Sequence, residues 1–427
     1  MATHTVNRVS STITRTFSSL TIRNYRLWVV GQGISLSGTW MQTVAQGLLV
    51  LHLTGSGTAL GLVTALQTIP VLLFGPWGGV VADRFPKRRI LYVTQAVSSV
   101  LALLLGTLVA TGAIRIEMVY LVALCLGTVS AVDNPTRKAF VVEMVGKDEI
   151  VNAVSLNSTE INLARVIGPA MAGVLIASVG LAACFLINGL SFLAVLAVLM
   201  AMRGEELRPT PIGPRMPGQL RQGLQYVRAS PVIRTILVMM AIIGTFTYEF
   251  SVSLPLFAEV TFRQGPATYA AMTAAMGLGA VVGGLYTASQ GIGSLRRLTI
   301  AALLFGASVL LTALAPTLPL ALLALLAVGF CSIGFTSLGN ATLQLTSSAE
   351  MRGRVMALWT VAFLGSTPIG GPVIGAIGEH VGPRWALALG GVAAVLAAGL
   401  GARVFRRQPE DAVPTRTAAG WQNPPPG

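Results

Sequence analysis

The stretch GGVVADRFPKRRIL, residues 78–91, decides the fold, because it concentrates charge in a chain that is otherwise apolar. Only 10% of the 427 residues are Asp, Glu, Lys or Arg, against about 25% in soluble domains, and 53% are hydrophobic. Mean hydropathy is +0.74. A water-soluble fold cannot cover its surface with so little charge. Five charges nevertheless fall within seven residues here: Asp83, Arg84, Lys87, Arg88 and Arg89.

Long uncharged runs flank this stretch and recur along the chain, for example over 27–82 and 298–349. A membrane-spanning helix needs about 20 mostly apolar residues, so each of these runs is long enough for two. The sequence therefore predicts an all-α, multi-pass membrane protein with twelve transmembrane helices. The predicted spans are 27–51, 58–82, 90–112, 117–136, 150–177, 181–202, 231–257, 267–290, 297–315, 318–340, 354–377 and 384–405.

The formal net charge of +14 is distributed over the connections between these spans. Nearly all of the 29 Lys and Arg residues fall on one side if both termini share that side, and only Arg115, Arg263 and Arg384 fall on the other. Cytoplasmic loops carry such an excess, so both termini are predicted to be cytoplasmic. Because the charges form no single basic face or tail, nucleic-acid binding is not predicted.

Residues 203–230 form the longest polar interruption and contain four prolines. They divide the chain into two halves of six predicted spans. Gly168, Gly173 and Gly180 align with glycines 202 positions later, which suggests an internal repeat. The predicted organisation is a cytoplasmic N-terminal segment, a six-helix bundle, a cytoplasmic linker that includes a short amphipathic helix at LRQGLQYVR, a second six-helix bundle and a disordered cytoplasmic tail, over 1–26, 27–202, 203–230, 231–405 and 406–427.

The stretch from Gly79 to Arg89 resembles the signature loop of the major facilitator superfamily, G-x-x-x-D-R-x-G-R-[KR]-x. The chain carries Pro86 where glycine is usual. The resemblance implies that the Asp of this loop lies against the start of span 11, near Arg354, and helps to close the inner gate. The alternative is that the loop is only a positively charged cytoplasmic anchor. The matching gating-loop positions are Gly79, Asp83, Arg84, Lys87 and Arg88.

A second motif, in span 5, resembles the G-P-x-x-G-G element of superfamily exporters and contains Gly168, Pro169 and Gly173. Ordinary close packing of small residues is an equal alternative. Together with AVDNPTRKAFVVEMV and FLINGLSF, these motifs are similar to the bacterial branch of enterobactin-exporter-like and drug-efflux proteins. That resemblance implies efflux by antiport against protons, with the proton gradient as energy source and no cofactor.

Three acidic residues are predicted within or beside spans, where an ionisable side chain is costly and is a functional candidate. They are Glu160 in span 5, Asp133 near the end of span 4 and Glu249 in span 7. Burial of a carboxyl group favours its protonated form, so each is a candidate for proton coupling. Glu160 is the first choice because it lies near the middle of its span. For Asp133, the alternative to proton coupling is a structural role in an interfacial salt bridge with Arg137.

Polar and aromatic side chains inside spans are candidates for lining a substrate cavity. Span 1 carries a polar stripe, and span 7 carries aromatic residues beside Tyr248. Plain packing is the alternative for each aromatic residue. The candidates are Thr39, Gln42, Gln46, Asn157, Arg165, Phe246 and Phe250.

The chain contains no phosphate-binding GxxxxGK[ST] loop, no HExxH and no nucleophile elbow, and its three cysteines have no metal-ligand spacing. We therefore expect neither an enzyme nor a metal site. The sequence favours a monomeric proton-coupled exporter of small amphiphilic molecules, in the bilayer of the bacterial cytoplasmic membrane, that works by alternating access. A proton-coupled importer and a transport-dead membrane receptor or scaffold are the alternatives.

Overall fold

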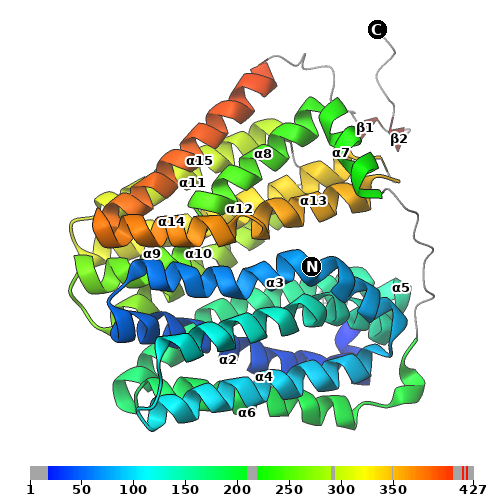
Figure 1. Ribbon diagram of the computed structural model, residues 1–427. Helices are drawn as coiled ribbons and strands as arrows, with labels where there is room; N and C mark the ends of the chain where they lie inside the picture. Colours follow the sequence, from blue (N-terminus) through cyan, green and yellow to red (C-terminus); the bar gives the residue numbers. More distant parts are fainter. Residues whose placement is uncertain are drawn as a thin grey trace, which may run out of the picture.

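The computed structural model describes residues 18–208, 219–289, 294–348, 350–406, 416–417 and 420–421. Apart from one pair of two-residue antiparallel strands, the described elements are helices (Figure 1). They are η1 Ser18–Thr21, α2 Arg23–Thr54, α3 Gly57–Arg84, α4 Lys87–Ala110, α5 Ile116–Ser178, α6 Leu181–Ala201, η2 Gly204–Glu206, α7 Gln219–Ala229, α8 Pro231–Phe246, α9 Phe250–Leu256, the π-helical turn η3 Phe257–Thr261, α10 Pro266–Ser289, α11 Leu295–Leu314, α12 Leu318–Thr346, α13 Arg352–Leu364, α14 Thr367–His380, α15 Pro383–Arg406, β1 Arg416–Thr417 and β2 Gly420–Trp421.

Eleven segments of the described chain are long and apolar enough to cross a membrane, and each overlaps one predicted span. The first predicted span, 27–51, lies within α2, which is 32 residues long but too polar to join those eleven. Apolar side chains on the outer faces of the helices are exposed, as at Leu314 (75%) and Leu285 (71%), which suits contact with lipid. Most of the predicted N-terminal segment and C-terminal tail lies outside the described residues.

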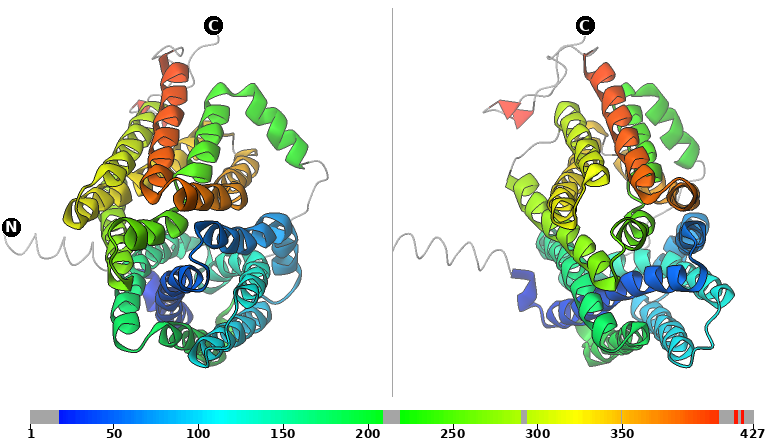
Figure 2. Two further views of the ribbon diagram at one scale, coloured as in Figure 1. Left: turned by 60° about the vertical axis from the view of Figure 1, so that its left-hand side comes forward. Right: turned by 90° about the vertical axis from the view of Figure 1, so that its left-hand side faces the viewer.

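Helices α2–α6 pack against one another, and helices α8–α15 form a second group (Figures 1 and 2). We call these the N-terminal and C-terminal groups. They meet where α3 packs against α14 and where α5 packs against α10. We name the two ends of the molecule after the α2–α3 turn at 55–56 and the α3–α4 turn at 85–86. Helices α8 and α15 slope away from the N-terminal group toward the 85–86 end (Figure 1).

Helix α5 corrects the predicted connection between spans 4 and 5, which covered residues 137–149. The helix continues through most of that segment and departs from helical geometry at Gly146, with φ 75° and ψ −176°. Only glycine adopts this conformation readily. Spans 4 and 5 are therefore two helices joined through one residue.

Two spans predicted as continuous helices are broken. Span 7 consists of α8 and α9, with Thr247–Glu249 between them, and span 11 consists of α13 and α14, with Gly365–Ser366 between them. The broken segments face each other, because α14 packs against both α8 and α9. The amphipathic helix predicted at LRQGLQYVR is present as α7, which packs against α8 and α13.

The glycines of the predicted repeat make matching contacts within each group. A Cβ atom at Gly168 would lie 2.6 Å from the carbonyl oxygen of Ser37 on α2. A Cβ atom at Gly370, 202 residues later, would collide with the carbonyl oxygen of Thr245 on α8. Each glycine therefore permits close packing on the first long helix of its own group.

The second aligned pair makes matching contacts between the groups. A Cβ atom at Gly173 would lie 2.9 Å from the Cβ of Ala270 on α10. A Cβ atom at Gly375 would collide with the carbonyl oxygen of Gly57 on α3. The repeat seen in the sequence thus has equivalent packing roles in three dimensions.

Candidate functional site

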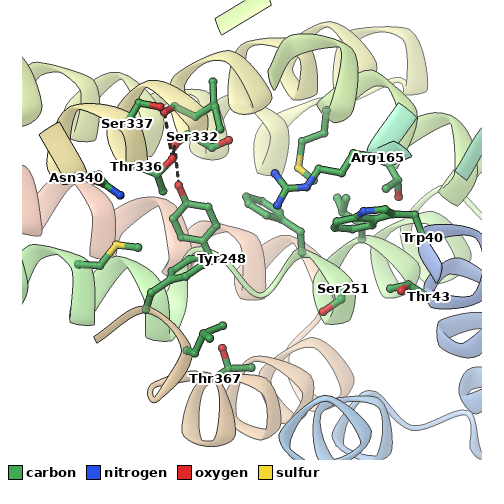
Figure 3. A pocket seen from close by; sticks show the side chains of 18 of the residues that line it. Trp40, Thr43, Arg165, Tyr248, Ser251, Ser332, Thr336, Ser337, Asn340 and Thr367 are labelled. Atoms are coloured by element: carbon green, nitrogen blue, oxygen red, sulfur yellow. Dashed lines mark hydrogen bonds between the residues drawn. The ribbon is translucent and has the colours of Figure 1, made fainter. Parts of the chain in front are cut away.

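A cavity of about 660 Å³ lies between the two groups of helices (Figure 3). Trp40 and Thr43 of α2 and Arg165 of α5 line it from the N-terminal group. Most of the other lining residues come from α8 to α10, α12 and α13 of the C-terminal group. Because both groups contribute, the shape of this cavity depends on how they are placed relative to each other.

A row of polar side chains on α12, absent from the predicted cavity residues, forms one wall of the cavity. Ser332, Thr336, Asn340 and Gln344 recur every four residues and all line the cavity. Such spacing places side chains on one side of a helix. The polar stripe predicted in α2 has a similar helical spacing of three to four residues, so the signal is present in the sequence.

Arg165 is the charged side chain of the cavity. Its guanidinium carbon lies 5.0 Å from the centroid of the Trp40 ring, within cation–π distance. Gly168, one turn further along α5, allows the close approach of α2 that places Trp40 there. The Nε atom of Arg165 is buried and has no hydrogen-bond partner among the described residues. The guanidinium group points into the space between Trp40 and Tyr248 (Figure 3).

Aromatic side chains form the wall nearest the break between α8 and α9. The Tyr248 hydroxyl donates a hydrogen bond of 2.8 Å to the carbonyl oxygen of Ser332 on α12. The Tyr248 ring packs edge-on against Phe363 of α13 at 5.1 Å between ring centroids, and against Phe250 at 6.3 Å. Tyr248 therefore ties the broken span to two neighbouring helices.

Two of the predicted cavity residues, Arg165 and Phe250, line this cavity. Phe246 and Asn157 are half-buried and are not among the lining residues.

The polar stripe of α2 also lies outside the cavity lining. Gln42 accepts a hydrogen bond of 2.7 Å from Asn188 of α6, and Gln46 accepts one of 3.3 Å from Gln67 of α3. Thr39 is exposed, and its hydroxyl donates to the backbone of its own helix. The two glutamines thus join helices within the N-terminal group.

Asp133 belongs to a buried polar network at the interface of three helices. It forms an ion pair with Arg137, and it accepts hydrogen bonds from Thr94 at 2.6 Å and from Gln95 at 2.9 Å, both on α4. Arg137 also donates to Gln32 of α2. This is the predicted salt bridge, extended by further partners.

Glu160 lies on α5 and faces α2, where Gly33 leaves room for it. Both of its carboxylate oxygens are buried and lack a hydrogen-bond partner among the described residues. Glu160 is not among the residues that line the cavity.

Glu249 lies between α8 and α9 and is only 2% exposed. Its carboxyl group faces Gly370 and Gly371 of α14 and has Thr367 as a hydrogen-bond partner. The Oε1 atom has no partner among the described residues. This acid therefore lies where the two broken spans meet.

Two basic side chains of the predicted gating loop, Lys87 and Arg88, bond to helices of the N-terminal group. Lys87 forms a buried ion pair of 2.6 Å with Glu143 of α5. Arg88 donates hydrogen bonds of 2.9 and 2.5 Å to the carbonyl oxygen of Leu199 on α6. Asp83 and Arg84 are exposed in the last turn of α3, which Gly79 precedes by one turn. A contact between Asp83 and the start of α13 stays a prediction.

The two groups are joined at the 55–56 end. Glu379 of α14 accepts hydrogen bonds from the Ser56 hydroxyl at 2.7 Å, the Thr58 amide at 2.9 Å and the Thr58 hydroxyl at 2.8 Å. We call these residues the 55–56 latch. Next to it, a Cβ atom at Gly371 would lie 2.9 Å from the Gly61 carbonyl oxygen, so α3 and α14 are in close contact.

Within the described part of the chain, no group of three or more His, Cys, Asp or Glu residues is placed to hold a metal ion. The arrangement instead offers a cavity between two groups of helices, one cation in its wall and carboxyl groups in the helices around it.

Several curated proteins are similar to this chain. It is 29% identical over 227 residues to the staphyloferrin A transporter of Staphylococcus aureus, and the match covers 53% of this chain and 57% of that protein. It is 27% identical to the multidrug efflux pump Tap of Mycobacterium tuberculosis, over 81% of this chain and 86% of that protein. The enterobactin exporter EntS of Escherichia coli is 24% identical, over 84% and 86% respectively.

Solved structures share the fold. A bacterial homologue of the human lysosomal transporter Spinster, in an inward-facing and unoccupied conformation, superimposes with a TM-score of 0.72 at 14% identity, over 90% of this chain and 96% of that one. The nucleoside transporter NupG gives 0.71 at 13% identity, over 90% and 100%. A family model described as a transmembrane secretion effector matches residues 14–425. The chain therefore belongs to this family of the major facilitator superfamily, whose members are multi-pass transporters of the bacterial cell membrane and not enzymes.

Proposed function

We propose that this protein is a proton-coupled exporter of small amphiphilic molecules that works by alternating access. The observation that carries the proposal is the cavity lined by both helix groups, with Trp40 and Arg165 on one side and the α12 row on the other. Relatives named as a multidrug efflux pump and an enterobactin exporter, each matched over more than four fifths of this chain, support the direction and the class of cargo.

In this proposal α2 is the first of twelve spanning helices, and the two groups are the six-helix bundles predicted from the sequence. Polar side chains make α2 less apolar than the other spans. Two of them, Gln42 and Gln46, form hydrogen bonds with α6 and α3, so α2 suits the interior of a bundle. One chain supplies both bundles, so the transporter works as a monomer.

The 85–86 end is the cytoplasmic end in this proposal, because the positively charged connections lie there. The latch at Glu379 then closes the outer end, and the conformation is the inward-facing one. Export requires the latch to break and α3 and α14 to separate. The contact predicted for Asp83 with the start of α13 would close the inner end in that state.

Glu160 is the proposed proton carrier. Asp133 is held by Arg137, Thr94 and Gln95, and protonation would disrupt that buried ion pair. The two oxygens of Glu160 have no such partners, so a proton can be gained or lost there without breaking a hydrogen bond. Glu249 is the second candidate for the proton carrier. It lies between α8 and α9 and faces α14, so a movement of α9 against α14 would change its surroundings.

Everted membrane vesicles that are energised and loaded with a pH-sensitive dye test this proposal. Wild-type vesicles should release protons from the lumen when a transported amphiphile is added, and Glu160→Gln should abolish that release while the protein still inserts and binds the amphiphile. Proton release that survives Glu160→Gln but not Glu249→Gln moves the coupling to α8–α9. Uptake into intact cells that is driven by protons would replace the exporter by the importer. Binding without any transport would identify a receptor.

A further inference from the structure

The charge of the cavity wall is one-sided. Among the 23 described residues that line the cavity, Arg165 is charged and none is Asp or Glu. Glu160 is on the same helix but about 140° around it from Arg165, and Glu249 is covered by α14. A molecule inside the cavity therefore meets one positive charge and no negative one.

We propose that the cavity binds an anionic aromatic amphiphile, in which a carboxylate or phenolate pairs with the guanidinium group of Arg165. The inference rests on the proposed function, because it names the class of substrate for the same cavity. It narrows the broad class of small amphiphiles to those with a negative charge.

The surroundings of Arg165 support this pairing. The guanidinium carbon lies over the Trp40 ring, and the N–H donors of a guanidinium lie along its edge, where a carboxylate binds with two parallel hydrogen bonds. The Nε atom is buried without a partner among the described residues. No acidic residue among the described ones that line the cavity pairs with this cation, so an anion that enters the cavity would supply the missing partner.

The opposite wall suits hydrogen-bond donors on the rest of the molecule. The hydroxyl groups of Ser332 and Thr336 donate to backbone carbonyls of α12, so their lone pairs remain to accept hydrogen bonds from a ligand. Trp40, Phe250 and Trp359 add aromatic side chains to the lining, which suits an aromatic scaffold. The volume of about 660 Å³ lies within the range of about 300–1,000 Å³ typical of small-molecule sites.

Two xanthene dyes with opposite charge test the inference on the purified full-length protein. Fluorescein carries a carboxylate and a phenolate, and rhodamine 123 carries a delocalised cation on the same ring system. Fluorescence anisotropy gives a Kd for each dye. We expect fluorescein to bind at least about tenfold more tightly than rhodamine 123, since a charge-assisted hydrogen bond is worth that much or more. Benzoate should displace bound fluorescein at concentrations where benzylamine does not.

Three variants assign the preference to Arg165. Arg165→Gln should weaken fluorescein binding about tenfold or more and Arg165→Lys less, because lysine keeps the charge but not the paired donors. Arg115→Gln, on an exposed arginine outside the cavity, is the matched control and should bind like wild type. If Arg165→Gln does not fold, the benzoate and benzylamine competition on wild type still decides the charge preference.

Equal binding of both dyes, tighter binding of rhodamine 123, no binding of fluorescein, or a fluorescein Kd that Arg165→Gln leaves unchanged would each overturn the inference. Transport is scored separately. A wild-type protein that binds fluorescein but moves no compound supports the anion site and removes the exporter proposal. A protein that exports rhodamine 123 but does not bind fluorescein would support the exporter proposal and overturn the anion site.

Discussion

Thr58 and Glu379 are joined by two hydrogen bonds, although 321 residues separate them in the sequence. The amide and the hydroxyl of Thr58 both donate to one carboxylate oxygen of Glu379, at 2.9 and 2.8 Å, and Ser56 donates to the same oxygen. The carboxylate also lies at the start of α3, where the helix dipole favours negative charge. One acidic side chain therefore links α14 to the beginning of α3.

Removing this carboxylate should shift the protein away from the conformation described here. Glu379→Ala loses three hydrogen bonds that join the two groups, so we expect the population with a separated 55–56 end to rise about threefold or more. Distances between spin labels in the turns at 55–56 and 381–382 measure that population. Glu117→Ala, which changes an exposed acid on one group only, is the control. Unchanged distances in Glu379→Ala would show that packing alone holds this end together.

The contact between α3 and α14 should be equally sensitive to size. Gly371→Ala adds a methyl group 2.9 Å from the Gly61 carbonyl oxygen, and such overpacking costs about 1–3 kcal/mol. The cost falls on the conformation with this end closed, so the same spin-label distances should lengthen and the rate of efflux should change. Gly399→Ala adds the same methyl group where no described atom beyond its own stretch of helix lies within 4 Å, and it should behave like wild type. A closed end that tolerates Gly371→Ala would mean that the helices can separate slightly without loss.

The network around Asp133 should matter for stability more than for coupling. Asp133→Asn leaves Arg137 without its charge partner in a mostly buried site, and breaking a buried ion pair in this way costs about 3–5 kcal/mol. We expect a marked fall in Tm in detergent. Glu206→Gln breaks the exposed pair with Arg203 at 3.2 Å and should change Tm little. A normal Tm for Asp133→Asn together with lost proton coupling would make Asp133 the coupling acid.

The hydroxyl of Tyr248 should contribute to binding through the position of the α12 wall. Tyr248→Phe removes the hydrogen bond to Ser332 but keeps the ring contacts. We expect the free energy of ligand binding to weaken by about 0.5–1.5 kcal/mol, which raises Kd roughly two- to tenfold. Isothermal calorimetry with a bound dye measures it. Tyr286→Phe, on an exposed side chain of α10, serves as control. Equal binding by wild type and Tyr248→Phe would show that the ring alone forms the wall.

The positions of the helices could be predicted from the sequence because a bilayer accepts only long apolar segments. Apolar runs with few charges located the segments, and the glycines 202 residues apart led to contacts that match in the two groups. The break at Thr247–Glu249 could not be predicted, since no glycine or proline occurs there. It accompanies contacts of Glu249 with Gly370 and Gly371 of α14, which are far away in the sequence.

The lining of the cavity was harder to predict, because a polar stripe does not reveal which neighbour it faces. Gln42 and Gln46 have the spacing expected of cavity residues, but Asn188 and Gln67 on adjacent helices satisfy them. The stripe from Ser332 to Gln344 has the same spacing and does reach the cavity. Only the packing of the helices distinguishes the two.

The single positive charge in the cavity wall has a consequence for energetics. If one anion leaves the cell while one proton enters, each cycle moves two charges in the direction favoured by a membrane potential that is negative inside. A potential of 100 mV then contributes about 4.6 kcal/mol per cycle, twice the 2.3 kcal/mol for a single charge. Transport would be electrogenic, and an ionophore that collapses the potential but leaves the pH gradient intact would slow the export of an anion more than the export of a neutral compound.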